Sequence, residues 1–418
     1  MPPGSESGRR RSSEILRRLL LYADRVYRLP ALLRGLQDRR QRPRIRAASV
    51  VCAVFLLFLA RMGSLHALEQ TRGRRFWHRW LQVPMPSADS IGRIFEGIDL
   101  DGFREVSYEL YHRFRRNKVF ADGDPAVLIL DGHETSASYR RHCDGCLQRR
   151  VKTAAGERIQ YYHRNVTALL QAGRFVFLLD AEPQQLGEDE VAVGVRLFER
   201  VVRHLPRAFE VVLADGLYAQ TRFVKSVRAC HKHLLAVLKE NRPDLLRDAR
   251  GLFACIPPVA DQQGRTERHL WDEEGFTSWD GFEDPVRVVR SLETTVVRHA
   301  DESEETRVAD WFWVTTLSPE QASTEQAVRL GHRRWTIENQ GFNELVSHWH
   351  ADHVYRHDPT AIMGFWLMAL LTYNLFHAFV SRRIQPALRR GHTVLHWARE
   401  MAADLYRDIP VEAWPLPP

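Results

Sequence analysis

The sequence contains few cysteines. There are five among 418 residues: Cys52, Cys143, Cys146, Cys230 and Cys255. Their odd number and irregular spacing exclude a secreted domain built on a framework of disulfide bonds. The first eleven residues also lack the apolar segment of a secretory signal peptide. We therefore expect a cytoplasmic protein.

Long apolar runs are scarce as well. Residues 47–60 form a run that is too short to cross a membrane and that ends at Arg61. Residues 361–380 are long enough, but polar residues interrupt them at positions 372, 374 and 377. A helix buried in a large core has the same composition. We interpret this segment as a core helix and expect no membrane contact.

Several motifs of common enzyme classes are missing. The sequence has no glycine-rich phosphate-binding loop and no strand-turn-helix motif that presents a nucleophilic serine. It has no internal repeat either. These absences argue against a P-loop nucleotide hydrolase, a serine hydrolase and a repeat protein.

Positive charge, in contrast, is in excess. Sixty Lys and Arg stand against 52 Asp and Glu, which gives a net charge of +8 and a pI near 9.4. Most of this charge is arginine, whose planar guanidinium suits phosphate. Two basic segments, residues 39–46 and 72–80, suit a nucleic-acid backbone, and the second is interleaved with aromatic residues that could stack. A solvated helix face has the same pattern, so both interpretations stay open. The candidate contact residues are Arg44, Arg46, Arg74, Arg75 and Arg79.

Changes in pattern divide the chain into five regions. Helical periodicity and basic connectors predict an all-helical, nucleic-acid-binding region over residues 1–121. Apolar runs followed by alternating strand and helix patterns predict a mixed α/β sheet flanked by helices over residues 122–240. Short strand-like pieces between acidic turns predict a β-rich insertion over residues 241–320. Helices return over residues 321–382, and residues 383–418 form a basic tail.

Two of the predicted buried strands end in an aspartate. Residues 126–130 lead to Asp131, and residues 211–214 lead to Asp215. Ligands and metals collect at this edge of an α/β sheet, although an aspartate there can also be a turn former or a helix cap. With the strand order 3-2-1-4-5, the two aspartates lie on neighbouring strands and can share an ion. Asp180 also follows an apolar run, but this order places it two strands away.

A glutamate on a later helix supplies the third acid. At helical spacing, Glu338 falls within an apolar stripe formed by Trp335, Phe342, Leu345 and Trp349. A carboxylate on a buried face is costly unless it is paired or binds a cation. Arg334, one turn earlier, is placed either to pair with Glu338 or to bind a phosphate.

Asp131, Asp215 and Glu338 together make an oxygen-rich site that suits Mg²⁺ or Mn²⁺. Two such ions activate a water or a 3′-hydroxyl and stabilise the leaving oxygen of an in-line phosphoryl transfer. We therefore predict a two-ion site that needs no nucleophilic side chain.

The segments around these acids resemble the three acidic motifs of DDE transposases from bacterial insertion sequences. They are Asp-Gly-His-Glu-Thr at 131–135, Ala-Asp-Gly-Leu-Tyr at 214–218 and Arg-Trp-Thr-Ile-Glu-Asn at 334–339. The resemblance covers residues 85–380 and favours the subgroup with a β-strand insertion before the glutamate. It implies a ribonuclease-H-like fold, metal-dependent cleavage at element ends and strand transfer to target DNA.

The resemblance also implies partners. They are double-stranded DNA, as terminal inverted repeats and as target, and a second copy that pairs two element ends in the bacterial nucleoid. Arg333 and Arg334 are expected to contact the DNA. Two alternatives remain open: a metal-dependent nuclease of the same fold that does not join strands, and a transposase-derived DNA-binding protein with an inactive site.

The chain departs from the subgroup at two positions. A Tyr–Arg–Glu–Lys signature often surrounds the glutamate there, and Arg334 and Glu338 match it. Gly331, however, stands at the tyrosine position and Leu345 at the lysine position. The sequence is closer to a branch that keeps an Arg-Trp-x-Ile-Glu-Asn element.

Cys143 and Cys146 form a CxxC motif, and His163 follows in the next predicted strand. Such a set can bind zinc, but a CxxC without a second pair at metal spacing is a weak signal. We expect a tight turn with two half-buried thiols and no zinc.

Overall fold

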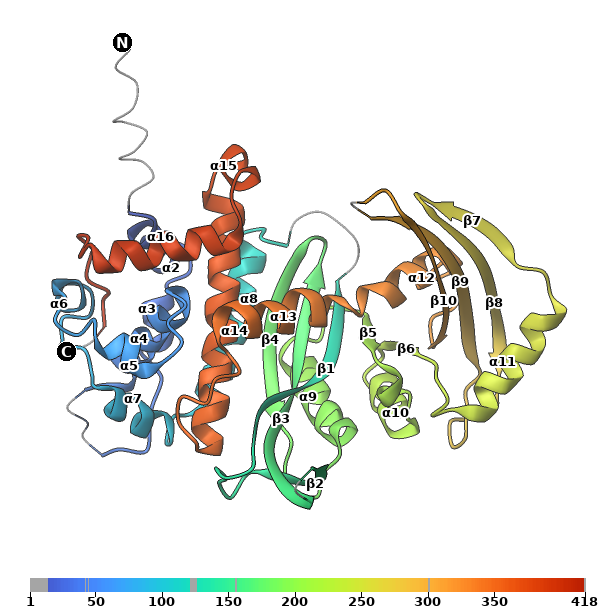
Figure 1. Cartoon of the computed structure of the whole chain (residues 1–418), viewed down its shortest axis with the longest axis horizontal. Helices are drawn as coiled ribbons and strands as arrows, with labels where there is room; N and C mark the ends of the chain where they lie inside the picture. Colours follow the sequence, from blue (N-terminus) through green and yellow to red (C-terminus); the bar gives the residue numbers. More distant parts are fainter. Residues whose placement is uncertain are drawn as a thin grey trace, which may run out of the picture.

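The computed structural model describes residues 14–41, 43, 45–120, 126–154, 156–299 and 301–416. Figure 1 shows a helical end, a central sheet with its helices, and a strand-rich end, arranged side by side along the longest axis. The long helix α14 (Pro359–Arg383) lies between the helical end and the sheet. It packs on α4 (Ala47–Leu59) and α8 (Leu100–Arg116) on one side and on β4 (Phe175–Pro183) on the other, so one helix is common to both parts.

The helical end forms around a helix that is apolar except for Ser49. All 13 residues of α4 are buried, which explains the apolar run in the sequence. Ser87 caps α7 (Ala88–Phe95) by accepting a hydrogen bond from the Ser90 N–H at 3.2 Å. The helices are α2 (Ile15–Arg25), α3 (Leu29–Leu33), α4 (Ala47–Leu59), α5 (Leu65–Glu69), α6 (Arg75–Leu81), α7 (Ala88–Phe95) and α8 (Leu100–Arg116).

The C-terminal residues join this helical end. They form α15 (Pro386–Arg390) and α16 (Val394–Tyr406), and α16 packs on α2. The buried Asp404 carboxylate accepts the backbone N–H of Leu16 at 3.0 Å, and the Trp414 N–H donates to the Trp80 carbonyl at 2.9 Å. This region was expected as a basic tail. It is folded because Trp397, Met401 and Leu405 form an apolar face of α16 that is buried against the helical end.

The central sheet has the predicted strand order. The strands that the apolar runs predicted are β1 (Val127–Ser138), β3 (Gly156–Ala172), β4 (Phe175–Pro183), β5 (Val211–Ala214) and β6 (His233–Val237). They lie side by side as β4-β3-β1-β5-β6, which is the order 3-2-1-4-5. β1, β5 and β6 are parallel, and β3 is antiparallel to both β1 and β4. The fold class is therefore confirmed as a mixed α/β sheet consistent with a ribonuclease-H-like transposase core.

In the central sheet, strand β2 was missed, and β1 extends beyond its expected end. β2 (Leu147–Thr153) pairs with the first half of β3, beside the end of β4. Five of its seven residues are exposed or half-exposed and charged or polar, so it lacks an apolar signal. β1 was expected to end at Asp131, but it continues to Ser138 because its second half still pairs with β3.

Helices cover the sheet on both faces. They are α9 (Glu190–His204), the short 3₁₀ helix η1 (Gly216–Tyr218), α10 (Thr221–Ala229), α12 (Thr324–Arg333), the π-helical turn η2 (Ile337–Phe342), α13 (Asn343–Trp349) and α14. α14 is long and apolar enough to cross a membrane, but 89% of its most apolar 18-residue segment is buried inside the protein. Its position between two packed layers accounts for its composition, as expected for a core helix.

The insertion extends the central sheet. β10 (Glu304–Thr315) pairs with β6, and β9 (Val286–Arg298), β8 (Thr266–Phe276) and β7 (Val259–Gln263) follow in order. The short strand-like pieces expected here join into longer strands: β9 is continuous through Ser291, which is buried and pairs with Leu270 of β8. Helix α11 (Pro243–Cys255), which the sequence analysis placed in a β-rich region, begins with Pro243 in its first turn and buries Leu245, Leu246, Ala249 and Phe253.

Candidate active site

Two aspartates meet where β1 and β5 run in parallel. The ladder pairs Leu130 with Ala214, so Asp131 and Asp215 are the next residues on the two strands. Both side chains line one pocket of about 490 Å³. The Asp131 side chain is 14% exposed and the Asp215 side chain is 26% exposed. Register alone therefore brings these two predicted site residues together.

Glu338 reaches the same pocket from η2. A π-helical turn adds a residue to the helical turn, which shifts the residues that face the core. Ile337 and Phe342 are buried, whereas the Glu338 side chain is 40% exposed. The prediction that Glu338 lies on a buried apolar stripe was therefore wrong in this detail, because the regular period on which it depended is broken here.

Arg334 links the three carboxylates. Its Nη1 donates to Glu338 Oε1 at 2.6 Å. Its Nη2 lies 3.6 Å from Asp131 Oδ2 and 3.8 Å from Asp215 Oδ1. The side chain is 4% exposed, and its guanidinium stacks on the Trp335 ring at 4.2 Å. A buried positive charge thus offsets part of the repulsion among the three acids.

A fourth acid, which the sequence analysis missed, lies in the pocket. Glu190 begins α9, and its carboxylate accepts hydrogen bonds from Arg164 and Tyr218, both at 3.2 Å. A side chain at Gly132 would place a Cβ 2.4 Å from this carboxylate, so glycine beside Asp131 makes the approach feasible. The available signal was an acid in the first turn of a predicted helix, which commonly means only a favourable interaction with the helix dipole.

The two aspartates differ in their electrostatics. Burial raises the pKa of Asp131 to about 7; Arg334 opposes the shift, whereas Glu338 and Glu190 add to it. Burial acts on Asp215 too, but a hydrogen bond from Lys239 at 2.9 Å and the Gly216 N–H outweigh it. The pKa of Asp215 is therefore lowered. One aspartate holds its proton more tightly than usual and its neighbour less tightly.

The donor set of this pocket fits a hard divalent cation. Asp131, Asp215 and Glu338 offer only carboxylate oxygens, the ligand type that Mg²⁺ and Mn²⁺ prefer. Burial is the main cause of the raised pKa of Asp131, but the carboxylates of Glu338 and Glu190 also contribute, so ionised Asp131 adds to an excess of negative charge among these acids. A bound cation would relieve this excess.

The structure explains the two departures from the Tyr–Arg–Glu–Lys signature. A Cβ at Gly331 would lie 2.4 Å from the Trp313 indole, so no tyrosine fits where α12 meets β10. Leu345 is fully buried, and a lysine there would bury an unpaired charge. Both positions have become part of the core in this chain.

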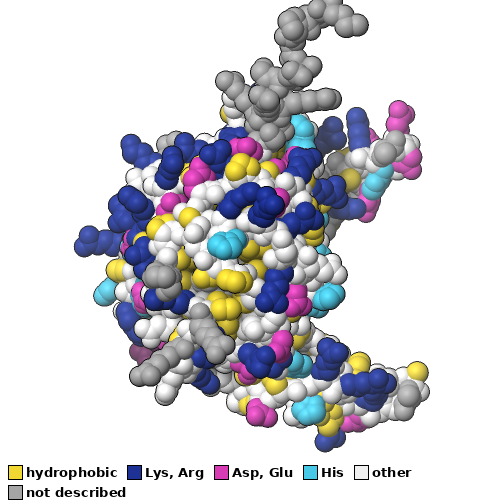
Figure 2. Space-filling model, turned by 90° about the vertical axis from the view of Figure 1, so that its left-hand side faces the viewer, with side chains coloured by type: hydrophobic (Ala, Val, Ile, Leu, Met, Phe, Trp, Pro, Cys, Tyr) yellow, Lys and Arg dark blue, Asp and Glu magenta, His cyan; other side chains and the backbone are white. Residues whose placement is uncertain are grey.

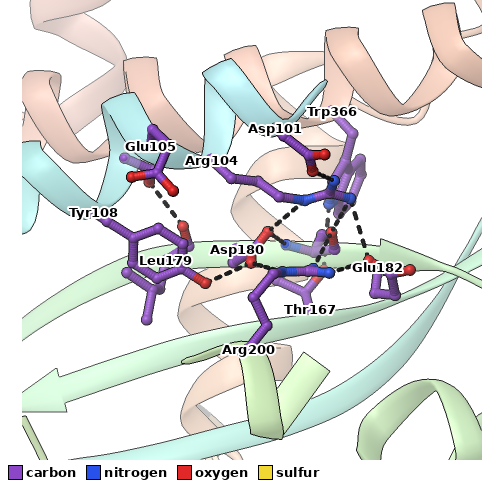
Figure 3. Close-up of polar contacts among 12 residues, drawn as sticks. Asp101, Arg104, Glu105, Tyr108, Thr167, Leu179, Asp180, Glu182, Arg200 and Trp366 are labelled. Carbon is purple, nitrogen blue, oxygen red and sulfur yellow. Dashed lines mark hydrogen bonds and ion pairs between the residues drawn. The ribbon is translucent and has the colours of Figure 1, made fainter. Parts of the chain in front are cut away.

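Asp180 lies outside the pocket, on β4, which is two strands from β1 and separated from it by β3. It is 0% exposed, and Figure 3 shows it between Arg104 of α8 and Arg200 of α9. Arg200 Nε donates to it at 2.8 Å and the Tyr108 hydroxyl at 2.7 Å. Glu182 on the same strand pairs with both arginines, at 3.2 and 2.6 Å. These contacts join two helices to β4, which is a structural role.

The arginines expected to contact DNA have different environments. Arg46, Arg74 and Arg75 are exposed on the helical end, where Figure 2 shows basic side chains spread across the face. Arg79 is half-buried and donates to the Asp408 carbonyl at 3.0 Å. Arg333 is half-buried and donates to Gln171 at 3.3 Å. Arg44 lies outside the described residues, and Arg334 lies in the pocket.

The aromatic residues of segment 72–80 are not available for stacking on bases. Phe76, Trp77 and Trp80 are at most 1% exposed and pack against one another and against Trp414. The alternation of arginine with aromatic residues therefore reflects a helix with one solvated face. The interpretation that these rings stack on nucleic acid was wrong, since the core of the helical end covers them.

The three candidate zinc ligands lie together at the other end of β1. Cys143 and Cys146 are in the turn before β2, and His163 on β3 faces both sulfurs at 3.3 and 3.2 Å. His357, which the sequence analysis did not single out, joins them from the segment before α14.

Comparison with known proteins identifies the family. No curated protein matches the chain. The family model described as Transposase DDE domain matches residues 122–375, a range that contains both aspartates, the insertion, Glu338 and the first part of α14. Since this match covers more than half of the 418 residues, the chain belongs to the DDE transposase family.

Proposed function

We propose that this transposase cleaves DNA at the ends of a mobile element and transfers the freed strands to target DNA. The observation that carries the proposal is the meeting of Asp131, Asp215 and Glu338 in one pocket around Arg334. In the proposal these three carboxylates hold Mg²⁺ or Mn²⁺. When bound, such ions activate an attacking water or 3′-hydroxyl and stabilise the leaving oxygen.

The side chains of the pocket have separate roles in this proposal. Asp131 and Asp215 provide oxygens from neighbouring strands, and Glu338 provides them from the helix that crosses the strand edge. Arg334 holds Glu338 toward the aspartates and adds positive charge beside the phosphate. Lys239, which is 53% exposed, extends this positive charge to the rim of the pocket.

DNA binding is proposed for the basic helical end. Arg46, Arg74 and Arg75 are exposed there and can contact phosphates of the terminal inverted repeat. Catalysis on two ends requires two active sites, so we propose that two copies act together on the bacterial nucleoid. Affinity for DNA should then fall steeply with salt, as phosphate contacts release counterions.

The test compares the wild-type protein with Glu338→Gln on DNA that carries the element's own ends. We expect cleavage that requires Mg²⁺ or Mn²⁺ in the wild type, loss of cleavage in Glu338→Gln, and equal DNA binding by both. Glu320→Gln is the matched control, because Glu320 is exposed and outside the pocket. A second reaction with pre-cleaved ends that carry a 3′-hydroxyl measures strand joining.

Each other result has a definite meaning. Cleavage without joining would identify a metal-dependent nuclease of the same fold. Binding without cleavage by either protein would identify a transposase-derived DNA-binding protein. Cleavage by both proteins would show that Glu338 is not the third acid and would overturn the proposed site.

A further inference from the structure

Four sulfur and nitrogen donors meet near the end of the paired strands β1 and β3. They belong to Cys143, Cys146, His163 and His357, and all four ligand atoms lie within 4.8 Å of one another. Cys146 is buried and the other three are half-buried. His163 lies across from Ser136 in the β1–β3 ladder, whereas Asp131 lies across from Thr167. The cluster is therefore distinct from the acidic pocket.

Four of the six distances between the donor atoms are close to those around a tetrahedral zinc ion. The two sulfurs are 3.7 Å apart, and His163 Nε2 lies 3.3 Å from Cys143 Sγ and 3.2 Å from Cys146 Sγ. His357 Nε2 lies 3.4 Å from Cys146 Sγ. Tetrahedral bonds of about 2.3 Å to sulfur and about 2.0 Å to nitrogen place two sulfurs about 3.8 Å apart, and a sulfur and a nitrogen about 3.6 Å apart.

We propose that Cys143, Cys146, His163 and His357 bind one Zn²⁺ as a closed structural site. The donors are two thiolates and two imidazoles, which favour zinc over the hard cations that suit carboxylates. Four protein ligands leave no open position for a substrate, so the ion stabilises the fold and takes no part in the reaction. Binding releases the two thiol protons to solvent and needs no oxidant or reductant.

The backbone around the cysteines forms a turn that brings the two sulfurs to the same side. The Cys146 N–H donates to the Cys143 carbonyl at 3.1 Å, and the Cys143 N–H points to Cys146 Sγ at 3.3 Å. A Cβ at Gly145 would lie 2.9 Å from Pro359 Cβ. The CxxC turn therefore rests directly on the start of α14, close to His357.

No zinc was expected from the sequence, because the CxxC motif has no second ligand pair at metal spacing. The fourth ligand is 211 residues away from Cys146, and only the fold brings it near. The ion would tie the turn after β1 to the segment between α13 and α14. It would thereby hold the chain that follows Glu338 against the strand that carries Asp131.

Metal content of the purified full-length protein tests the proposal without DNA. We expect about one zinc per chain in the wild type, and almost none in a Cys143→Ser/Cys146→Ser double variant. Cys230→Ser/Cys255→Ser is the matched control and should keep its zinc, since both thiols lie outside the cluster. His357→Gln should bind zinc at least about tenfold more weakly than wild type. His353→Gln, four residues earlier, should bind zinc as tightly as the wild type.

Cobalt binding to the zinc-free wild type covers the case in which the double variant does not fold. We expect intense absorption from cobalt–thiolate bonds and tetrahedral coordination, together with a higher melting temperature when the metal is restored. A weak, octahedral spectrum would place the metal on carboxylates and overturn the proposal. Equal zinc in the double variant and the wild type, or no zinc in either, would overturn it as well.

Discussion

Aspartates lie close to arginines at two places in the central sheet: around Asp180 on β4 and in the acidic pocket around Arg334. The two places differ in how completely the aspartate oxygens are paired. Asp180 is 0% exposed, and its partners approach closely: Arg200 at 2.8 Å and the Tyr108 hydroxyl at 2.7 Å. Its other oxygen accepts the Ala181 N–H at 2.7 Å. Arg104 Nε lies 3.3 Å from this second oxygen, so both oxygens of the buried carboxylate are surrounded by donors and little capacity remains for a ligand.

The acidic pocket is the opposite case. Arg334 approaches Asp131 and Asp215 only to 3.6 and 3.8 Å. Lys239 lies closer, 2.9 Å from Asp215, but it is 53% exposed, and the cavity beside the two aspartates has a volume of about 490 Å³. In the sequence, Asp131 and Asp180 look alike, since each follows an apolar strand. The comparison teaches that saturation by close partners marks a structural aspartate, whereas incomplete pairing beside open volume marks one that is available for chemistry.

Replacing a pocket aspartate should have the largest effect on activity. We expect Asp215→Asn to lower the cleavage rate about a thousandfold, because a lost cation ligand removes several kcal/mol of stabilisation from the transition state. Single-turnover cleavage of the element ends measures this. The matched control is Asp244→Asn, an exposed acid on α11, and it should cleave like the wild type. Normal cleavage by Asp215→Asn would show that the acidic pocket, like the site of Asp180, takes no part in the reaction.

Replacing Asp180 should instead destabilise the fold. Asp180→Asn leaves Arg104 and Arg200 buried without their full partner, and we expect it to lower the free energy of unfolding by about 3–5 kcal/mol. Chemical denaturation measures this. Asp101→Asn also removes an Arg104 partner, but Asp101 is 87% exposed, so the loss should stay below about 1 kcal/mol. An unchanged stability of Asp180→Asn would contradict the structural role.

The packing behind Arg334 offers a smaller test. Gly331→Ala drives a methyl group into the Trp313 indole, and we expect a loss of about 1–3 kcal/mol in the free energy of unfolding. Gly391→Ala is the control, since its nearest neighbour would be 3.8 Å away. Thermal unfolding of both variants gives the comparison. Equal stability would mean that α12 can shift on β10, and that the position of Arg334 is not fixed by this contact.

Glu190 should have the mildest effect. Glu190→Gln keeps the shape of the pocket but removes one negative charge beside Asp131, so the Mg²⁺ concentration for half-maximal cleavage should rise about tenfold. The maximal rate should change less. Glu199→Gln, an exposed acid on the same helix, should leave the Mg²⁺ dependence unaltered. A thousandfold loss of maximal rate instead would place Glu190 among the ligands.

Much of the fold could be predicted because its signals are local. Continuous apolar runs identify the buried strands, and the alternation of strand and helix gives the parallel register that aligns Asp131 with Asp215. The exposure of Glu338 could not be predicted, because a π-helical turn breaks the regular period that the stripe argument needs. The aromatic residues of α6 were misinterpreted since burial in a helical core and stacking on bases require the same residue types.

Other features depend on contacts between distant segments. Glu190 enters the pocket only because Gly132 leaves space for it, and His357 reaches the cysteines only through the position of α14. The continuity of the insertion with the central sheet depends on β10 pairing with β6. No periodicity within a segment carries such information.

The stability of Asp131→Asn as a function of pH, measured without divalent cations, tests the central claim most directly. The pKa of Asp131 is about 7 in the folded protein and about 3.9 in an unfolded chain, so its ionisation destabilises the fold as pH rises through this range. Asparagine is neutral at every pH in this range, so its presence does not lower the free energy of unfolding as pH rises. We predict that Asp131→Asn melts at a higher temperature than the wild type at pH 8, and that the difference narrows toward pH 5. A variant that is less stable than the wild type across the whole range would show that Asp131 is a structural aspartate like Asp180, and would contradict the account.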